Sequence, residues 1–114
     1  IMPFNAWLLL RGLRTMPLRL ERIEKTTYQV LAYLQQQPLV QNILFPFANN
    51  FPQQALAKSQ MKAALGLLTF TLNTNTAKGV NAFCESLKHI PMAVSWGGHE
   101  SLIIPKLAFI HEQD

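Results

Sequence analysis

The stretch Ala93-Val94-Ser95-Trp96-Gly97-Gly98-His99-Glu100-Ser101-Leu102 is the part of the sequence around which we interpret the fold. A short apolar run that ends in a hydroxyl, a large aromatic side chain and two glycines predicts a strand that leaves a sheet in a sharp turn. Glycines adopt positive φ and let another group approach the main chain, while an indole can pack and still offer its N–H. The turn at residues 95–98 is therefore the best candidate for a binding site.

The composition indicates a surface with much apolar area. Of 114 residues, 49% are hydrophobic and 14% are charged, against about 25% charged in a typical soluble domain. Such a chain either pairs with a partner through a broad apolar face or belongs to a larger body that covers it. Because the sequence starts at Ile1 without a preceding Met, we expect a piece of a longer protein, comprising one domain at most.

Charge and cysteine content argue against several classes of protein. The net charge is +4, but the early basic residues alternate with Glu21 and Glu24, which is typical of a solvated helix face. The single cysteine, Cys84, excludes an internal disulfide framework and falls on an apolar helical stripe, where we interpret it as a buried hydrophobe. No run approaches the roughly 20 apolar residues of a membrane span. We therefore expect a cytoplasmic protein that binds neither nucleic acid nor membranes.

Helices are predicted before the first strand. Pro3 suits a first helical turn, and the residues up to Gly12 are strong helix formers and nearly all apolar, so we expect this first helix to be buried. Pro17 breaks or kinks the path. An amphipathic helix follows from Leu20, with apolar residues at three- and four-residue steps, and ends near Gln37.

The rest of the chain alternates short strands with short helices. Periodicity and turn residues predict strands over residues 40–45, 67–72 and 92–95, and helices over 53–61 and from residue 77 onward. Thr76 is expected to cap the last helix, and Phe70 and Leu72 to share one face of the second strand. This order indicates an α+β fold with a small sheet and helices on one face.

The residues alone identify no reaction. The pair His99-Glu100 resembles the start of a zinc-protease helix, but Ile103 stands where the second histidine would be, and no metal site is expected. The histidines are too far apart in sequence to suggest a ligand set: His89, His99 and His111. No nucleophile-elbow pattern surrounds Ser95, and two glycines fall short of a phosphate-binding loop. The spacing of these residues in the sequence fits a structural role for Ser95 and Trp96 as well as it fits a functional one.

Two motifs in the sequence resemble those of a known enzyme family, and this resemblance suggests a reaction that the residue spacing alone does not. Residues 95–102 resemble the Ser-(Leu or Trp)-Gly-Gly-x-Glu-Ser-Leu signature of the Cys/Met-metabolism family of pyridoxal-phosphate enzymes. Residues 3–15 are similar to the family's Pro-Phe-Asp-Ala-Trp-Leu-Leu-Leu-Arg-Gly-Leu-Lys-Thr helix, and residues 40–46 fall where the family has its Val-x-x-Val-x-Tyr-Pro strand. Two positions depart from the pattern: Ile23 replaces a His, and Phe47 replaces a Gly.

The resemblance implies a specific place in a larger fold. Residues 1–37 would be connecting helices, and residues 38–114 the small C-terminal α+β domain of a fold type I enzyme. That domain has a short, mostly antiparallel sheet with helices on one face, preceded by a long kinked helix. The large cofactor-binding domain would lie outside this chain. Together with neighbouring subunits of a homodimer or homotetramer, it would cover the first helix and one sheet face.

The resemblance also implies a cofactor, a substrate and site residues. The cofactor would be pyridoxal phosphate, and the small-molecule substrate a sulfur amino acid. Ser95 would contact the cofactor, and Ser95 and Trp96 would line the site that holds the substrate carboxylate. The lysine that binds the cofactor and the carboxylate-binding arginine would lie outside the chain. No catalytic residue is therefore expected within it, and the chain alone is expected to be inactive.

The residues beside Ser95 favour one branch of the family. Members that catalyse γ-elimination or γ-replacement commonly carry Glu before the Ser and Leu after it, whereas Val94 and Trp96 resemble the β-lyase branch. We therefore expect β-elimination of cystathionine to homocysteine, pyruvate and ammonia, with the γ reactions as the alternative. A non-enzymatic alternative is an interaction domain that pairs through its apolar face. A parent gene with Ser-x-Thr-Lys upstream and an Arg-containing strand downstream would support the enzyme.

Overall fold

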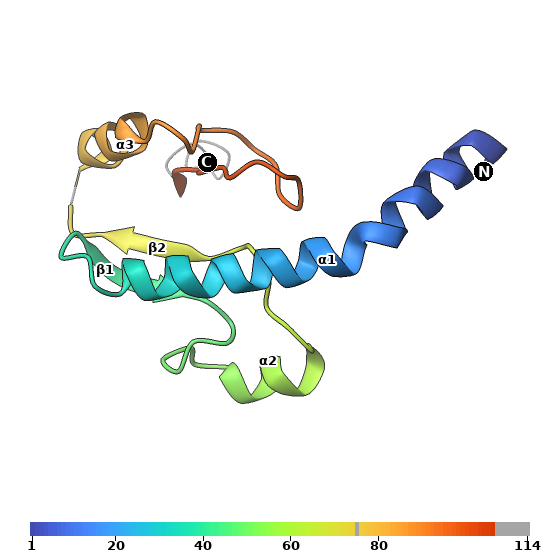
Figure 1. The fold of residues 1–114 in the computed structure, drawn as a ribbon. Coiled ribbons are helices and arrows are strands. Elements are labelled where there is room, and N and C mark those ends of the chain that lie inside the picture. Colours follow the sequence, from blue (N-terminus) through green and yellow to red (C-terminus); the bar gives the residue numbers. More distant parts are fainter. Residues whose placement is uncertain (75, 107–114) are drawn as a thin grey trace, which may run out of the picture. The chain divides into compact units, whose positions relative to one another are not determined.

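The computed structural model describes residues 1–74 and 76–106, which contain three helices and two strands (Figure 1). In chain order these are α1 (Pro3–Leu34), β1 (Val40–Leu44), α2 (Gln54–Gln60), β2 (Thr69–Leu72) and α3 (Ala77–Ser86). The two strands pair antiparallel, and the predicted α+β class is confirmed. Within the described residues, no helix combines the length and the apolar character needed to cross a membrane.

The helix α1 is continuous, as the resemblance to a fold with a long kinked helix implies, although the residue pattern alone leaves a break at Pro17 open. Pro3 occupies its first turn, where the missing N–H would have no helical partner in any case. Pro17 lies inside the helix, and Figure 1 shows the N-terminal part of α1 turning away from the line of the rest. A proline ring removes one main-chain hydrogen bond and pushes against the carbonyl four residues earlier, which bends a helix. Pro17 therefore kinks α1 without breaking it.

The first helical segment is exposed within this chain, so its predicted burial stays a prediction that rests on a surface outside the chain. Its large apolar side chains are 42% to 65% exposed, at these positions: Phe4, Trp7, Leu8, Leu9, Leu10 and Leu13. The contacts that the structure shows here stay within the helix, since Trp7 stacks on Phe4 and the Arg11 guanidinium lies 5.9 Å from the Trp7 ring. An apolar helix face is buried only when a second surface packs against it.

Residues 1–36 and 44–68 form one compact unit. Phe45 is its fully buried aromatic side chain and lies edge-on to Tyr28, with ring centroids 5.7 Å apart. The buried Thr27 donates its hydroxyl to the Ile23 carbonyl at 2.8 Å, which satisfies its polar group. The other buried side chains of this unit are small or aliphatic: Leu31, Ala48, Ala57 and Ala64. They fix α2 and its flanking loops within the unit.

Residues 37–43 and 69–114 form the second unit, of which the structure describes the part up to residue 106. In β2, Phe70 and Leu72 are half-buried while the threonines are exposed, as the alternation predicts. The ring of Phe70 lies edge-on to Phe83 of α3 at 6.0 Å. Cys84 is buried, as predicted, and the Gly79 N–H donates to the Thr76 hydroxyl at 3.1 Å, so the predicted helix cap is confirmed.

The strand predicted over residues 92–95 is wrong. Only Met92 pairs, in an isolated parallel bridge with Ile103. The Ala93 N–H donates to the Ile103 carbonyl at 3.3 Å, and the Ile103 N–H donates to the Pro91 carbonyl at 3.1 Å. Residues 91–100 are exposed throughout, so the apolar run has no sheet face to cover. Without buried side chains to hold its register, the pairing ends after one residue.

Candidate functional site

The turn at residues 95–98 lies in a loop that the bridge between Met92 and Ile103 closes at its base. Gly97 has φ +80°, and it is the one residue in the described part of the chain with positive φ. Glycine adopts this left-handed conformation without the steric cost that a Cβ would bring. The predicted glycine turn is confirmed, and its shape depends on Gly97.

The two predicted site residues are exposed to solvent. Trp96 is 84% exposed, and Ser95 is also exposed. Neither side chain makes a hydrogen bond or ring contact with any of the residues described at 1–74 and 76–106. The Ser95 hydroxyl, the indole N–H and the main chain of the turn are therefore accessible to a molecule outside this chain.

The neighbouring pair His99-Glu100 is a local feature of the same turn. The Nδ1 atom of His99 lies 3.3 Å from Oε2 of Glu100, and the His99 side chain is 98% exposed. A hydrogen bond from its own backbone N–H, and then the charge of His99, lower the pKa of the Glu100 carboxyl. A Cβ on Gly98 would meet this carboxylate, which is the flexible end of the Glu100 side chain and can shift.

The described residues were compared with two further kinds of site, a metal-ion site and a reactive thiol. They contain no group of three histidine, cysteine or acidic side chains that could hold a metal ion, and His111 lies outside them. Burial, and to a lesser degree the charge of Glu85, raises the pKa of the Cys84 thiol. A thiol of raised pKa is a poor nucleophile, because the reactive form is the thiolate.

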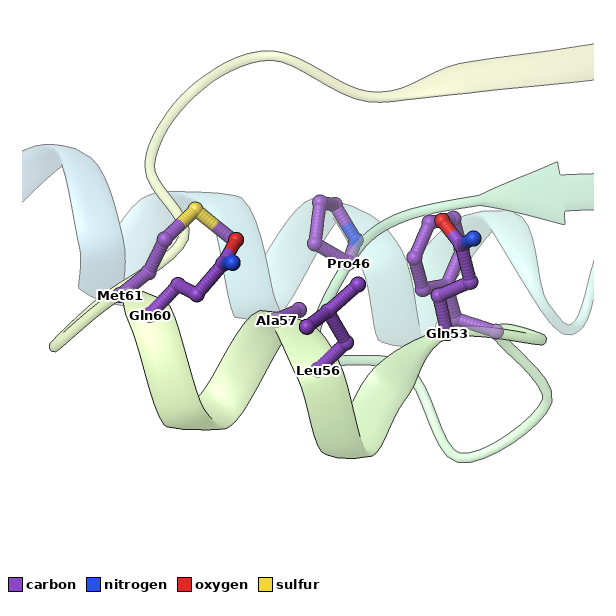
Figure 2. A pocket seen from close by; sticks show the side chains of 7 residues that line it. Pro46, Gln53, Leu56, Ala57, Gln60 and Met61 are labelled. Atoms are coloured by element: carbon purple, nitrogen blue, oxygen red, sulfur yellow. The ribbon is translucent and has the colours of Figure 1, made fainter.

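Two hollows in the first unit are lined by residues other than those of the turn. One hollow of about 190 Å³ is in the first unit, and Figure 2 shows its labelled lining residues: Pro46, Gln53, Leu56, Ala57, Gln60 and Met61. A second hollow, of about 310 Å³, lies along α1 and is lined by Leu8, Arg11, Gly12 and Thr15. Neither is lined by Ser95 or Trp96.

The chemistry of the turn fits one wall of an anion-binding site. A serine hydroxyl and main-chain N–H groups held in a fixed turn can donate hydrogen bonds to a carboxylate, and an indole offers one further donor. The turn contains no amine that could bind an aldehyde cofactor covalently. The donor set therefore fits a carboxylate or another small anion.

The bridge that closes this loop was not predicted from the sequence. The available signal was the pair of short apolar runs, residues 92–94 and 102–104, that flank the polar turn. Their parallel pairing at Met92 and Ile103 holds the two ends of the turn together.

Comparison with known proteins gives consistent matches over nearly the whole chain. A model of the family described as Cys/Met metabolism PLP-dependent enzyme matches residues 1–113. The chain is 36% identical to a cystathionine gamma-lyase of Bacillus subtilis and 35% identical to a cystathionine beta-lyase of Lactococcus lactis. Each alignment covers 89% of this chain but 26% of the relative, so the chain spans about a quarter of these relatives.

A solved structure shows the same arrangement of the chain. The crystal structure of cystathionine gamma synthase from Xanthomonas oryzae pv. oryzae, in complex with aminoacrylate and cysteine, is similar with a TM-score of 0.83 and 34% identity. The match covers 96% of this chain and 28% of that one. Sequence and structure therefore agree on the relatives of this chain.

Proposed function

This chain belongs to the Cys/Met metabolism PLP-dependent enzyme family, and from that premise we propose that its full-length protein is a carbon–sulfur lyase acting on a sulfur amino acid. The observation that carries the proposal is the match of residues 95–102 to the family signature, in a turn whose Ser95 and Trp96 are exposed. Pyridoxal phosphate, when bound in the full-length protein, supplies an electron sink for cleavage of the carbon–sulfur bond.

Within that enzyme, we assign the turn to binding of the substrate carboxylate. The Ser95 hydroxyl and main-chain N–H groups of the turn would donate hydrogen bonds to the carboxylate. The indole of Trp96 donates its N–H or excludes water from these hydrogen bonds. Donors that a turn already aims cost little reorganisation when the substrate binds, and they fix the orientation of the bond to be broken.

A Ser95→Ala variant of the full-length protein tests this assignment. A hydrogen bond to a charged group contributes about 1.5–3 kcal/mol, so KM should rise roughly tenfold or more while kcat changes less. Ser86→Ala is the matched control, because this serine is exposed in the same unit and its hydroxyl donates to the Phe83 carbonyl. Equal KM values for the two variants would contradict the assignment.

The favoured reaction is β-elimination of cystathionine, which gives homocysteine, pyruvate and ammonia. The support comes from Val94 and Trp96 on either side of Ser95. The identities to a gamma-lyase and a beta-lyase, 36% and 35%, are too close to separate the branches. γ-Elimination or γ-replacement on the same turn is the second candidate.

The rest of the enzyme is proposed to complete the site. Residues 1–37 would connect a large cofactor domain to a small domain at residues 38–114, in a cytoplasmic homodimer or homotetramer. The exposed apolar side chains at the start of α1 support a covering surface outside this chain. The chain alone, mixed with pyridoxal phosphate and cystathionine, should therefore form no oxo acid and no absorbance band of covalently bound cofactor. Either signal would contradict the need for further residues.

A further inference from the structure

A set of hydrogen bonds reaches across the kink of α1. Nη1 of Arg19 donates to the Gly12 carbonyl at 3.2 Å and also to the Thr15 hydroxyl. The Thr15 hydroxyl donates to the same carbonyl at 3.4 Å. Pro17 lies between the two ends of this connection, and all four residues belong to the same compact unit. The three bonds therefore join the parts of α1 before and after Pro17.

The position of these residues around the helix matches the inner side of a proline bend. At 3.6 residues per turn, residues 12, 15 and 19 fall within about 60° of one another, and Pro17 lies about 140–160° away from them. The proline ring pushes against the carbonyl four residues earlier, so the helix bends away from the ring. The hydrogen bonds thus lie on the face toward which the helix bends, where its two parts approach each other.

The Gly12 carbonyl is open to the guanidinium of Arg19. A Cβ built at Gly12 would meet no atom within 4 Å, so this contact does not depend on residue 12 being glycine. A carbonyl oxygen has two lone pairs and can accept a side-chain donor in addition to a helical one. A guanidinium offers several N–H donors in a fixed plane and can engage the carbonyl and the Thr15 hydroxyl together.

We propose that Arg19, acting with Thr15 on the Gly12 carbonyl, fixes the bend of α1 and so sets the direction of its exposed apolar segment, residues 4–13. Pro17 makes the bend possible by removing a main-chain hydrogen bond, but a proline kink alone leaves a range of angles. The side-chain connection selects one of them. Arg19 is in this sense a positioning residue for the surface that α1 presents.

Spin labels on either side of the bend test the proposal. Asn5→Cys and Lys25→Cys place labels at exposed positions of α1 in the full-length protein, in which Cys84 and any cysteine outside this chain are replaced by Ala. The distance distribution between the labels is then measured with Arg19→Met, which keeps an unbranched stem and removes both donors. Arg14→Met is the matched control, since Arg14 is an exposed arginine of α1 whose side chain makes no hydrogen bond in the described structure.

Arg19→Met should widen the distribution and move its mean toward the roughly 30 Å spanned by 20 residues of straight helix. Thr15→Val, which removes only the hydroxyl, should give a smaller change in the same direction. Arg14→Met should leave both mean and width unchanged. The proposal is overturned if the Arg19→Met distribution coincides with that of Arg14→Met. It is equally overturned if Thr15→Val and Arg19→Met both leave the unsubstituted distribution intact.

Discussion

Two glycines of this chain have equal space around them but different backbone requirements. A Cβ would meet no atom within 4 Å at Gly12 or at Gly97, yet only Gly97 has positive φ. Gly97→Ala should therefore disfavour the observed turn by about 1–2 kcal/mol, which lowers its population roughly tenfold. Backbone NMR couplings and chemical shifts over residues 95–98 would report the change.

Gly12→Ala is the control for that substitution. Alanine in a helix interior is more favourable than glycine by about 0.5–1 kcal/mol, so this variant should stabilise α1 and leave the shifts of the turn unchanged. Unaltered couplings in Gly97→Ala would show that the positive φ does not hold the turn in its present shape.

The carboxyl of Glu100 should titrate below the ordinary range of a glutamate. Its own backbone N–H and then His99 lower its pKa, so an NMR titration should give a pKa below that of an unperturbed glutamate. A lowered folded-state pKa stabilises the folded turn above the unfolded pKa, and this contribution is lost as pH falls through the folded pKa. His99→Gln should raise the pKa only in part, because the backbone N–H remains. A titration at or above the ordinary value would contradict the described geometry.

The Thr76 cap is expected to stabilise the whole of α3, because it satisfies a main-chain N–H in the first turn of the helix. The Thr76 hydroxyl accepts the Gly79 N–H at 3.1 Å, so Thr76→Ala leaves that donor without its partner. The substitution should cost about 1 kcal/mol, whereas Thr76→Ser keeps the oxygen and should cost less. Urea unfolding, with hydrogen exchange at the first turn of α3, separates the two variants. Equal stability of Thr76→Ala and Thr76→Ser would rule out a capping role.

Elements with strong local signals could be predicted from the sequence. The cap at Thr76, the alternation around Phe70 and the apolar run before Pro46 each identify an element from its own residues, and the structure has a helix and two strands there. The residues around Pro17 permit either a break or a kink. The long kinked helix was predicted only from the family resemblance, and the structure has it as α1.

Elements that depend on a second surface were predicted least well. The first part of α1 has the composition of a buried helix, but the described residues leave Phe4 and Leu10 exposed. The residues after Pro91 have the composition of a strand, but only Met92 forms a bridge. An apolar composition shows that a segment can be buried. Whether it is buried depends on a second surface that packs against it.

At the scale of the whole molecule, the family could be identified from the sequence and the site only in part. The signature at residues 95–102 identifies Ser95 and Trp96 as candidates, and the structure confirms the glycine turn that carries them. Among the described residues it does not gather them with other polar side chains, and the chain spans about a quarter of these relatives.

The most direct test of the proposed function is product analysis with the full-length protein. The protein, loaded with pyridoxal phosphate, is incubated with cystathionine, and the amino acid and oxo acid released are identified by mass spectrometry. We predict homocysteine and pyruvate in equal amounts, together with ammonia. Cysteine with 2-oxobutyrate would contradict β-elimination and the role assigned to Trp96, and the absence of any oxo acid would contradict a cystathionine lyase altogether.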